Sequence, residues 1–236
     1  VYKRQTVYFI DFYKSNFFIR TKQAKVAIFT TPCRIKNLSL RLKQSLVNDM
    51  KYTSYSYPSG RAEVAAFVVT GGVTEYHVMI HATDPKQTYR EQMNAVLDAY
   101  AALLKKELPG AVAVFKRYFL SDAANQAELL LAATAESSDC ALSVVEQSPL
   151  DGTKIALWAY LQTDVQTRVL PNGLYEVKHG AYRQLWMGGS FNRAANSEYQ
   201  MRLLLNDYAM QLMEEGCTLA DNCLRTWIFV QNVDCN

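Results

Sequence analysis

Three histidines are the side chains of this 236-residue chain most suited to acid–base or metal chemistry. His77 and His81 lie in "EYHVMIHATD", and His179 ends "YEVKH". A four-residue step along a strand separates two side chains by about 13 Å, too far to share one metal ion. None of the three lies in a nucleophile-elbow or other catalytic motif. We therefore expect solvated or edge-strand histidines and no metal site.

Other motifs that could bind a cofactor are also missing from the sequence. The pairs Gly71-Gly72 and Gly188-Gly189 do not fit the G-x-G-x-x-G or P-loop pattern. Gly71-Gly72 separates two β-rich runs and predicts a hairpin turn. The five cysteines are odd in number and lack C-x-x-C spacing, so the sequence predicts no zinc site. No cofactor is expected.

The elements that must position any site occur twice, at an offset of 108 residues. "REQMNAVLDAYA" and "EYQMRLLLNDYA" pair Gln92 with Gln200 and Tyr100 with Tyr208. Apolar residues three and four apart predict a helix in each copy, over 88–106 and 198–215. With a one-residue insertion, "VFKRYFLS" aligns with "CLRTWIFV". A whole folding unit is therefore repeated.

The element order predicts an α+β fold in two tandem units. The first unit, about 60–164, reads as ββαβαββ, with Asp122 capping its second helix. The second unit, 170–236, restarts the same order and reaches ββαβ at Asn236, so we expect it to be truncated. Helices on one face of a mixed sheet give a ferredoxin-like arrangement. The helix-free face needs another sheet or another subunit to cover it.

Residues 1–49 differ from the rest of the chain. They carry ten Lys/Arg against two Asp, whereas residues 50–236 carry 15 Lys/Arg against 20 Asp/Glu. They lack helical or alternating periodicity, and Met50 is the first methionine. We expect a non-native or disordered leader that packs poorly against the body. A basic arm for nucleic acid or anionic lipid is the alternative.

The second unit resembles the Rid (YjgF-type) family of enamine/imine deaminases, formerly called endoribonuclease L-PSP. "GLYEVKHGAYRQLWMGGS", the Gln200 helix and "EEGCTLADNCLRTWIFVQNVD" carry the resemblance. It covers 173–236 and, more loosely, 63–162. It implies a chorismate-mutase-like α+β unit that forms trimers with small-molecule clefts between subunits. A tandem chain would make part of that trimer-like contact internally, and a homo-oligomer through sheet faces is expected.

The resemblance also implies a substrate-binding site in the second unit. Tyr175 falls on a family pocket tyrosine, and Gly188 falls on a position that is often serine. Ser190 would substitute for that hydroxyl, and Gly189 lies where the family brings backbone amides close to the ligand. A pocket near these four residues is expected, with walls from a neighbouring unit.

The first unit is expected to be catalytically degenerate. Asp139-Cys140 stands where the family has its carboxylate-binding arginine, and Ala156 where it has its water-positioning glutamate. The corresponding residues of the second unit would lie beyond Asn236, so no catalytic residue is assigned.

The implied function of the intact protein is hydrolytic deamination of reactive enamine or imine intermediates. A non-catalytic small-molecule-binding or scaffolding protein is one alternative, and a chorismate-hydrolysing relative is another. Nucleic acid is not an expected partner, because Lys116, Arg117 and Arg225 read as alternating strand charges facing solvent. No apolar run approaches the roughly 20 residues of a membrane span, and no secretory signal is visible, which predicts a cytoplasmic protein.

Overall fold

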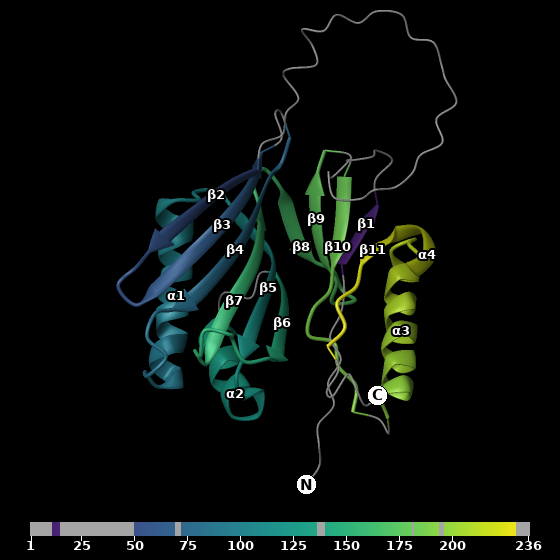
Figure 1. Cartoon of the computed structure of the whole chain (residues 1–236). Coiled ribbons are helices and arrows are strands. Elements are labelled where there is room, and N and C mark those ends of the chain that lie inside the picture. Colours follow the sequence, from purple (N-terminus) through teal and green to yellow (C-terminus); the bar gives the residue numbers. More distant parts are fainter. Residues whose placement is uncertain are drawn as a thin grey trace, which may run out of the picture.

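The computed structural model describes residues 11–14, 50–68, 72–135, 140–180, 182–193 and 196–229. Two β-sheets lie next to each other, and helices lie on their outer sides (Figure 1). The α+β class is confirmed. Among the described residues, no helix has the length and apolar character needed to cross a bilayer.

The first sheet has six strands in the order β2-β3-β4-β7-β5-β6. Its strands are β2 (Met50–Ser56), β3 (Gly60–Val68), β4 (Thr74–Ala82), β5 (Val112–Leu120), β6 (Ala141–Glu146) and β7 (Ile155–Gln162). β5 and β6 are parallel and joined through α2 (Ala123–Thr134), and the other neighbours are antiparallel. The predicted ββαβαββ order runs from β3 to β7, and β2 precedes it.

Helix α1 (Tyr89–Lys106) covers one face of this sheet. Thr88 caps its N-terminus and forms a capping box with Glu91, which satisfies backbone N–H groups that have no partner within the helix. Its buried stripe, which includes Val96 and Leu103, joins the core formed with β3, β4 and β7. The helix ends before Pro109-Gly110, as the sequence predicts.

The second sheet has the order β11-β1-β10-β9-β8. Its strands are β1 (Asp11–Lys14), β8 (Gln166–Val169), β9 (Tyr175–His179), β10 (Tyr182–Trp186) and β11 (Cys223–Arg225). Helix α3 (Ser197–Glu214) packs Leu204, Tyr208 and Leu212 onto it, and the short α4 (Leu219–Asn222) precedes β11. Both bounds of α3 lie 108 residues after those of α1, so the sequence repeat is also a repeat of structure.

Strand β1 departs from what the sequence led us to expect of residues 1–49. Asp11–Lys14 pairs antiparallel with β10 and with β11, inside the second sheet. The expectation that this segment stays apart from the body is therefore wrong for these four residues. The reason is that the partner strands lie some 170 residues or more along the chain, beyond the reach of any local pattern. Residues 1–10 and 15–49 lie outside the described residues.

The helix-free faces of the two sheets pack against each other. Phe115 and Tyr160 come from the first sheet, and Val177 and Trp186 come from the second, in one buried cluster. The Phe115 and Trp186 rings are 5.8 Å apart, and those of Tyr160 and Trp186 are 5.1 Å apart. The second unit thus supplies the cover that the first sheet needs.

This packing corrects the prediction for Lys116 and Arg117, which are both buried. β5 is an interior strand with α1 over one face and the second sheet over the other, so neither side of it faces solvent. Arg117 lies 5.3 Å from the Trp158 ring and 4.8 Å from the Trp227 ring, and these aromatic faces stabilise its charge. Arg225 is exposed, as predicted.

A buried carboxylate holds the outer face of the second sheet. The Glu176 side chain is 1% exposed and accepts hydrogen bonds at 2.5 Å from Arg168 and from Arg183, with Lys178 at 3.2 Å. Burial alone would raise the pKa of Glu176, but these three cations outweigh it and lower the pKa to about 2. Arg183 also bonds Glu215, so the sheet is tied to the end of α3.

Glu176→Gln is expected to lower the free energy of unfolding by about 2–3 kcal/mol at pH 7, because charged hydrogen bonds are lost. A carboxyl whose pKa is lowered on folding stabilises the fold above its ordinary pKa of 4.5, and that stabilisation is lost as the pH falls towards 2. The gap between variant and parent should therefore narrow from pH 5 to pH 3 in denaturant titrations. The exposed Glu198→Gln is the control, within about 0.5 kcal/mol. A gap that does not change with pH would contradict this account.

Candidate functional site

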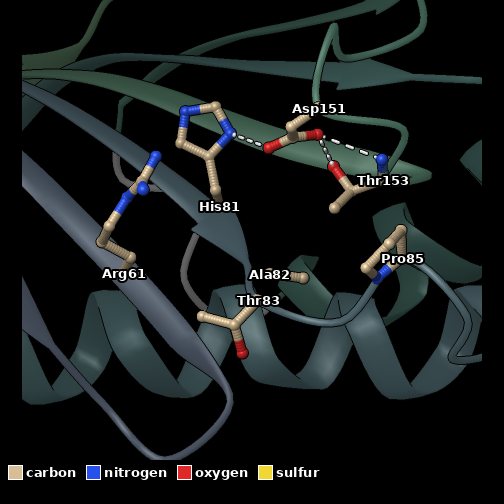
Figure 2. A pocket seen from close by; sticks show the side chains of 7 residues that line it. All are labelled: Arg61, His81, Ala82, Thr83, Pro85, Asp151 and Thr153. Carbon is tan, nitrogen blue, oxygen red and sulfur yellow. Dashed lines mark hydrogen bonds and ion pairs between the residues drawn. The ribbon is translucent and has the colours of Figure 1, made fainter.

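A cavity of about 180 Å³ opens where β3 begins and β4 ends (Figure 2). It is lined by Arg61, His81, Ala82, Thr83, Pro85, Asp151 and Thr153. A cation, an imidazole, a carboxylate and a hydroxyl thus converge on one small space. Such a combination is typical of a binding or catalytic site for a small polar molecule.

The central feature of the cavity is a histidine–aspartate pair. His81 Nδ1 lies 2.8 Å from Asp151 Oδ2, and Asp151 Oδ1 accepts hydrogen bonds from the Thr153 amide at 3.0 Å and hydroxyl at 2.6 Å. Partial burial alone would raise the pKa of Asp151, but the Thr153 hydrogen bonds and the neighbouring His81 outweigh it and lower that pKa. The ionised carboxylate stabilises a proton on Nδ1 and leaves Nε2 as the basic nitrogen. Figure 2 shows Nε2 on the side of the ring away from Asp151.

Local sequence explains how Asp151 reaches His81. Pro149 to Thr153 form the turn before β7, in which the Gly152 amide donates to the Pro149 carbonyl at 3.3 Å. Gly152 has φ +80°, a conformation that glycine adopts without strain. The Asp151 side chain caps the turn through Thr153, so its second oxygen is held towards β4.

His81 stands in the interior of the sheet, opposite Arg61 of β3 on one side and Ala156 of β7 on the other. Its side chain is 18% exposed. The expectation of a solvated or edge-strand residue is therefore wrong for His81, because β7 returns from later in the chain to cover the free edge of β4. His77 is exposed, as predicted, and stacks on Trp158.

Gln92 of α1 holds two walls of the cavity together. Its buried amide nitrogen donates to the carbonyls of Pro85 and Gln87 at 3.2 and 3.0 Å, and its oxygen accepts from the Lys154 amide at 2.7 Å. The loop after β4 and the turn before β7 are thereby fixed to one helix. The position of Asp151 relative to His81 depends on this link.

The four residues predicted to bind substrate lie elsewhere, on the side of the second unit that faces the first sheet. Tyr175 is 3% exposed, and its hydroxyl donates to the Ala113 carbonyl at 3.3 Å. A Cβ atom at Gly188 would lie 2.4 Å from the Leu142 carbonyl oxygen, so the glycine permits close backbone packing. Gly189 follows with φ +73°, and Ser190 is partly buried. None of the four lines the cavity described above, and their ligand-binding role stays a prediction.

The repeat nevertheless relates the two places. At the offset of 108 residues, His81 corresponds to Gly189 and Ala82 to Ser190. The cavity of the first unit therefore lies at the position where the resemblance puts a ligand in the second. Transferring the predicted site back by this offset is the sequence signal that could have identified His81. Asp151 carries no such signal, because only the fold brings its turn to β4.

Of the residues that mark the first unit as degenerate, Ala156 and Cys140 are buried, and Asp139 lies outside the described residues. Within the described ranges, no group of three His, Cys, Asp or Glu side chains is placed to hold a metal ion.

Gln92→Leu is expected to lower the free energy of unfolding by about 2–4 kcal/mol, because buried backbone groups lose their partners. Thermal and denaturant unfolding would measure the change. Asn94→Leu, an exposed polar-to-apolar change on the same helix, is the matched control and should stay within about 0.5 kcal/mol. Equal effects of the two substitutions would show that the Gln92 hydrogen bonds do not hold the loops.

No model of a known protein family matches the chain, and no curated protein or solved structure matches it.

Proposed function

We propose that this protein is a Rid-like hydrolase that deaminates a small enamine or imine in the cavity beside His81. The His81–Asp151 contact at 2.8 Å, inside a cavity bordered by a guanidinium group, carries the proposal. A histidine held by a carboxylate is suited to move protons near neutral pH.

In the proposed reaction, water adds to the carbon of the C=N bond. His81 Nε2 accepts a proton from the attacking water, while the nitrogen of the substrate takes up a proton and its C=N π bond breaks. The resulting amino alcohol then loses ammonia, as the C–N bond breaks and its hydroxyl becomes a carbonyl. His81 passes the proton on to the departing nitrogen, so the protein ends in its starting state. Asp151 stabilises the imidazolium formed in between.

Arg61 is the group that would bind an acidic substituent of the substrate. Its guanidinium borders the cavity and forms a 3.2 Å ion pair with Glu63 in which both side chains are about half exposed. An exposed pair of this kind contributes little free energy, so a carboxylate can compete for the arginine. Arg61 is also directly opposite His81 in the β3–β4 ladder, which places the two groups side by side.

The proposal accounts for the alanine at position 156. The resemblance puts a water-positioning glutamate there, and Ala156 is the cross-strand neighbour of His81. An acid–base group on the adjacent strand can act on a water in the same part of the sheet. His81 with Asp151 would thus replace the chemistry of the missing glutamate.

Binding without turnover is the second candidate. Ala156 and the buried Cys140 favour it, because neither offers the carboxylate or guanidinium of the family pattern. In that case the cavity would bind a small acid, and the His81–Asp151 pair would recognise it by hydrogen bonding.

His81→Gln is expected to lower kcat/KM for imine hydrolysis by about 10²–10⁴-fold, because the general base is removed. The substrate can be generated in situ by oxidation of an α-amino acid, and formation of ammonia and 2-oxo acid measured above the spontaneous rate. His77→Gln makes the same change four residues away on β4, outside the cavity, and should leave the rate unchanged. Binding of the 2-oxo acid product without any rate above background in the parent protein would favour the second candidate.

Arg61→Gln should affect binding more than chemistry. We expect KM to rise by about tenfold or more while kcat changes by less than about threefold, because the arginine contacts the substrate carboxylate in ground and transition states alike. Steady-state kinetics separate the two parameters. Glu63→Gln, which frees Arg61 from its ion pair, should lower KM or leave it unchanged. A fall in kcat alone for Arg61→Gln would assign it a different role.

A further inference from the structure

We propose that β1 is an exchangeable strand, and that the slot between β10 and β11 also accepts β1 of a second copy of this chain. The partner is thus the protein itself, and each copy would complete the second sheet of the other. The inference rests on the register of β1, on the elements it contacts and on its distance along the chain from the next described strand.

β1 occupies in the second sheet the place that β7 occupies in the first. On the side of the hairpin strand, Ala159 of β7 is opposite Val78 of β4, and Asp11 of β1 is opposite Trp186 of β10. Val78 and Trp186 are equivalent at the repeat offset of 108. The equivalence holds along the whole of β1, since the pairing then runs in step to Lys14.

The other side of the slot gives the same register. Ala159 is opposite Lys116 of β5, and Asp11 is opposite Arg225 of β11. Lys116 and Arg225 are the residues that the repeat pairs when its one-residue insertion is included. β10 and β11 therefore form a slot with the geometry of a complete unit, and the strand that fills it comes from the far end of the chain.

The slot needs an occupant. Without β1, β10 would present an open edge of N–H and C=O groups, and β11 would lose the strand through which it joins the sheet. Extended segments bind readily to such edges through main-chain hydrogen bonds.

A second copy can supply the occupant without loss of contacts. β1 packs against β10, β11 and α4, all of which belong to the second unit. Its chain reaches the first unit at Met50 after the 35 residues 15–49, a covalent reach on the order of 100 Å. That length allows β1 to enter its own slot or the slot of a neighbour with identical pairing, which is the condition for domain swapping.

Concentration should decide between the two arrangements. A tether of this kind holds β1 near its own slot at an effective concentration of about 1 mM, so exchange becomes comparable as the protein approaches that value. Below it, the exchanged fraction should rise about tenfold for each tenfold increase in protein concentration.

Two single-cysteine variants of the full chain test the exchange. Tyr13→Cys and Gln184→Cys change residues that are directly opposite in the β1–β10 ladder, where the Cα atoms of an antiparallel pair are close enough for a disulfide. The variants are mixed, unfolded, refolded together at about 10 and 100 µM, and oxidised. A disulfide between the two new cysteines is necessarily intermolecular, and peptide mass spectrometry distinguishes it from disulfides of the native cysteines.

We expect the 13–184 disulfide to form and to increase about tenfold between the two concentrations. Tyr13→Cys mixed with Glu198→Cys, an exposed position on α3, is the control and should give at least tenfold less product. The double variant, Tyr13→Cys with Gln184→Cys in one chain, should close within the chain at low concentration. If the double variant closes while the mixture never cross-links above the control, exchange is ruled out. If the double variant does not close either, β1 does not occupy the slot and the proposal fails.

Discussion

The burial of two helix-free sheet faces against each other is the interaction on which the rest of this structure depends. Each unit places its helices on one face of a sheet, which leaves an apolar face that cannot remain in water. Phe115 and Trp186 meet at the centre of the joint core. Gly188 lets the second backbone approach the Leu142 carbonyl, and Tyr175 pairs its buried hydroxyl with Ala113. The surfaces that the resemblance assigns to ligand are therefore occupied in large part by contacts between the units, and the cavity beside His81 lies apart from them.

The cavity depends on a second constraint, which is local to the first unit. The loop after β4 and the turn before β7 come from segments some 70 residues apart, and neither has a regular hydrogen-bonding pattern of its own. Gln92 binds both from the start of α1, and Lys154 Nζ repeats two of the same contacts to Pro85 and Gln87. Because α1 is anchored by its buried stripe, these bonds transmit the rigidity of the core to the position of Asp151. A histidine and a carboxylate can be held in contact at a partly exposed site only with support of this kind.

The accuracy of the sequence predictions follows the range of the interactions concerned. The bounds of α1, its capping box and the 108-residue repeat were predictable because they depend on neighbours within one or two helical turns. Lys116 and Arg117 were misread because charge alternation normally marks a half-exposed strand, and only the tertiary structure shows that both faces of β5 are covered. β1 was missed because its partners lie at the other end of the chain. His81 and Asp151 are far apart in sequence, and a turn geometry that no motif specifies brings them together.

The two units use one scaffold but differ in chemical equipment at the same place. Where the first unit has His81, the second has Gly189, which carries no side chain and cannot accept or donate a proton from one. Where the first unit inserts β7 together with its preceding Asp151 turn, the second inserts β1 from the N-terminal part of the chain. On the function proposed above, proton transfer therefore resides in the unit that departs most from the family pattern, at Ala156 and its neighbours. The second unit then contributes by covering the first sheet, so that the first keeps one face free of helices without exposing that face to water.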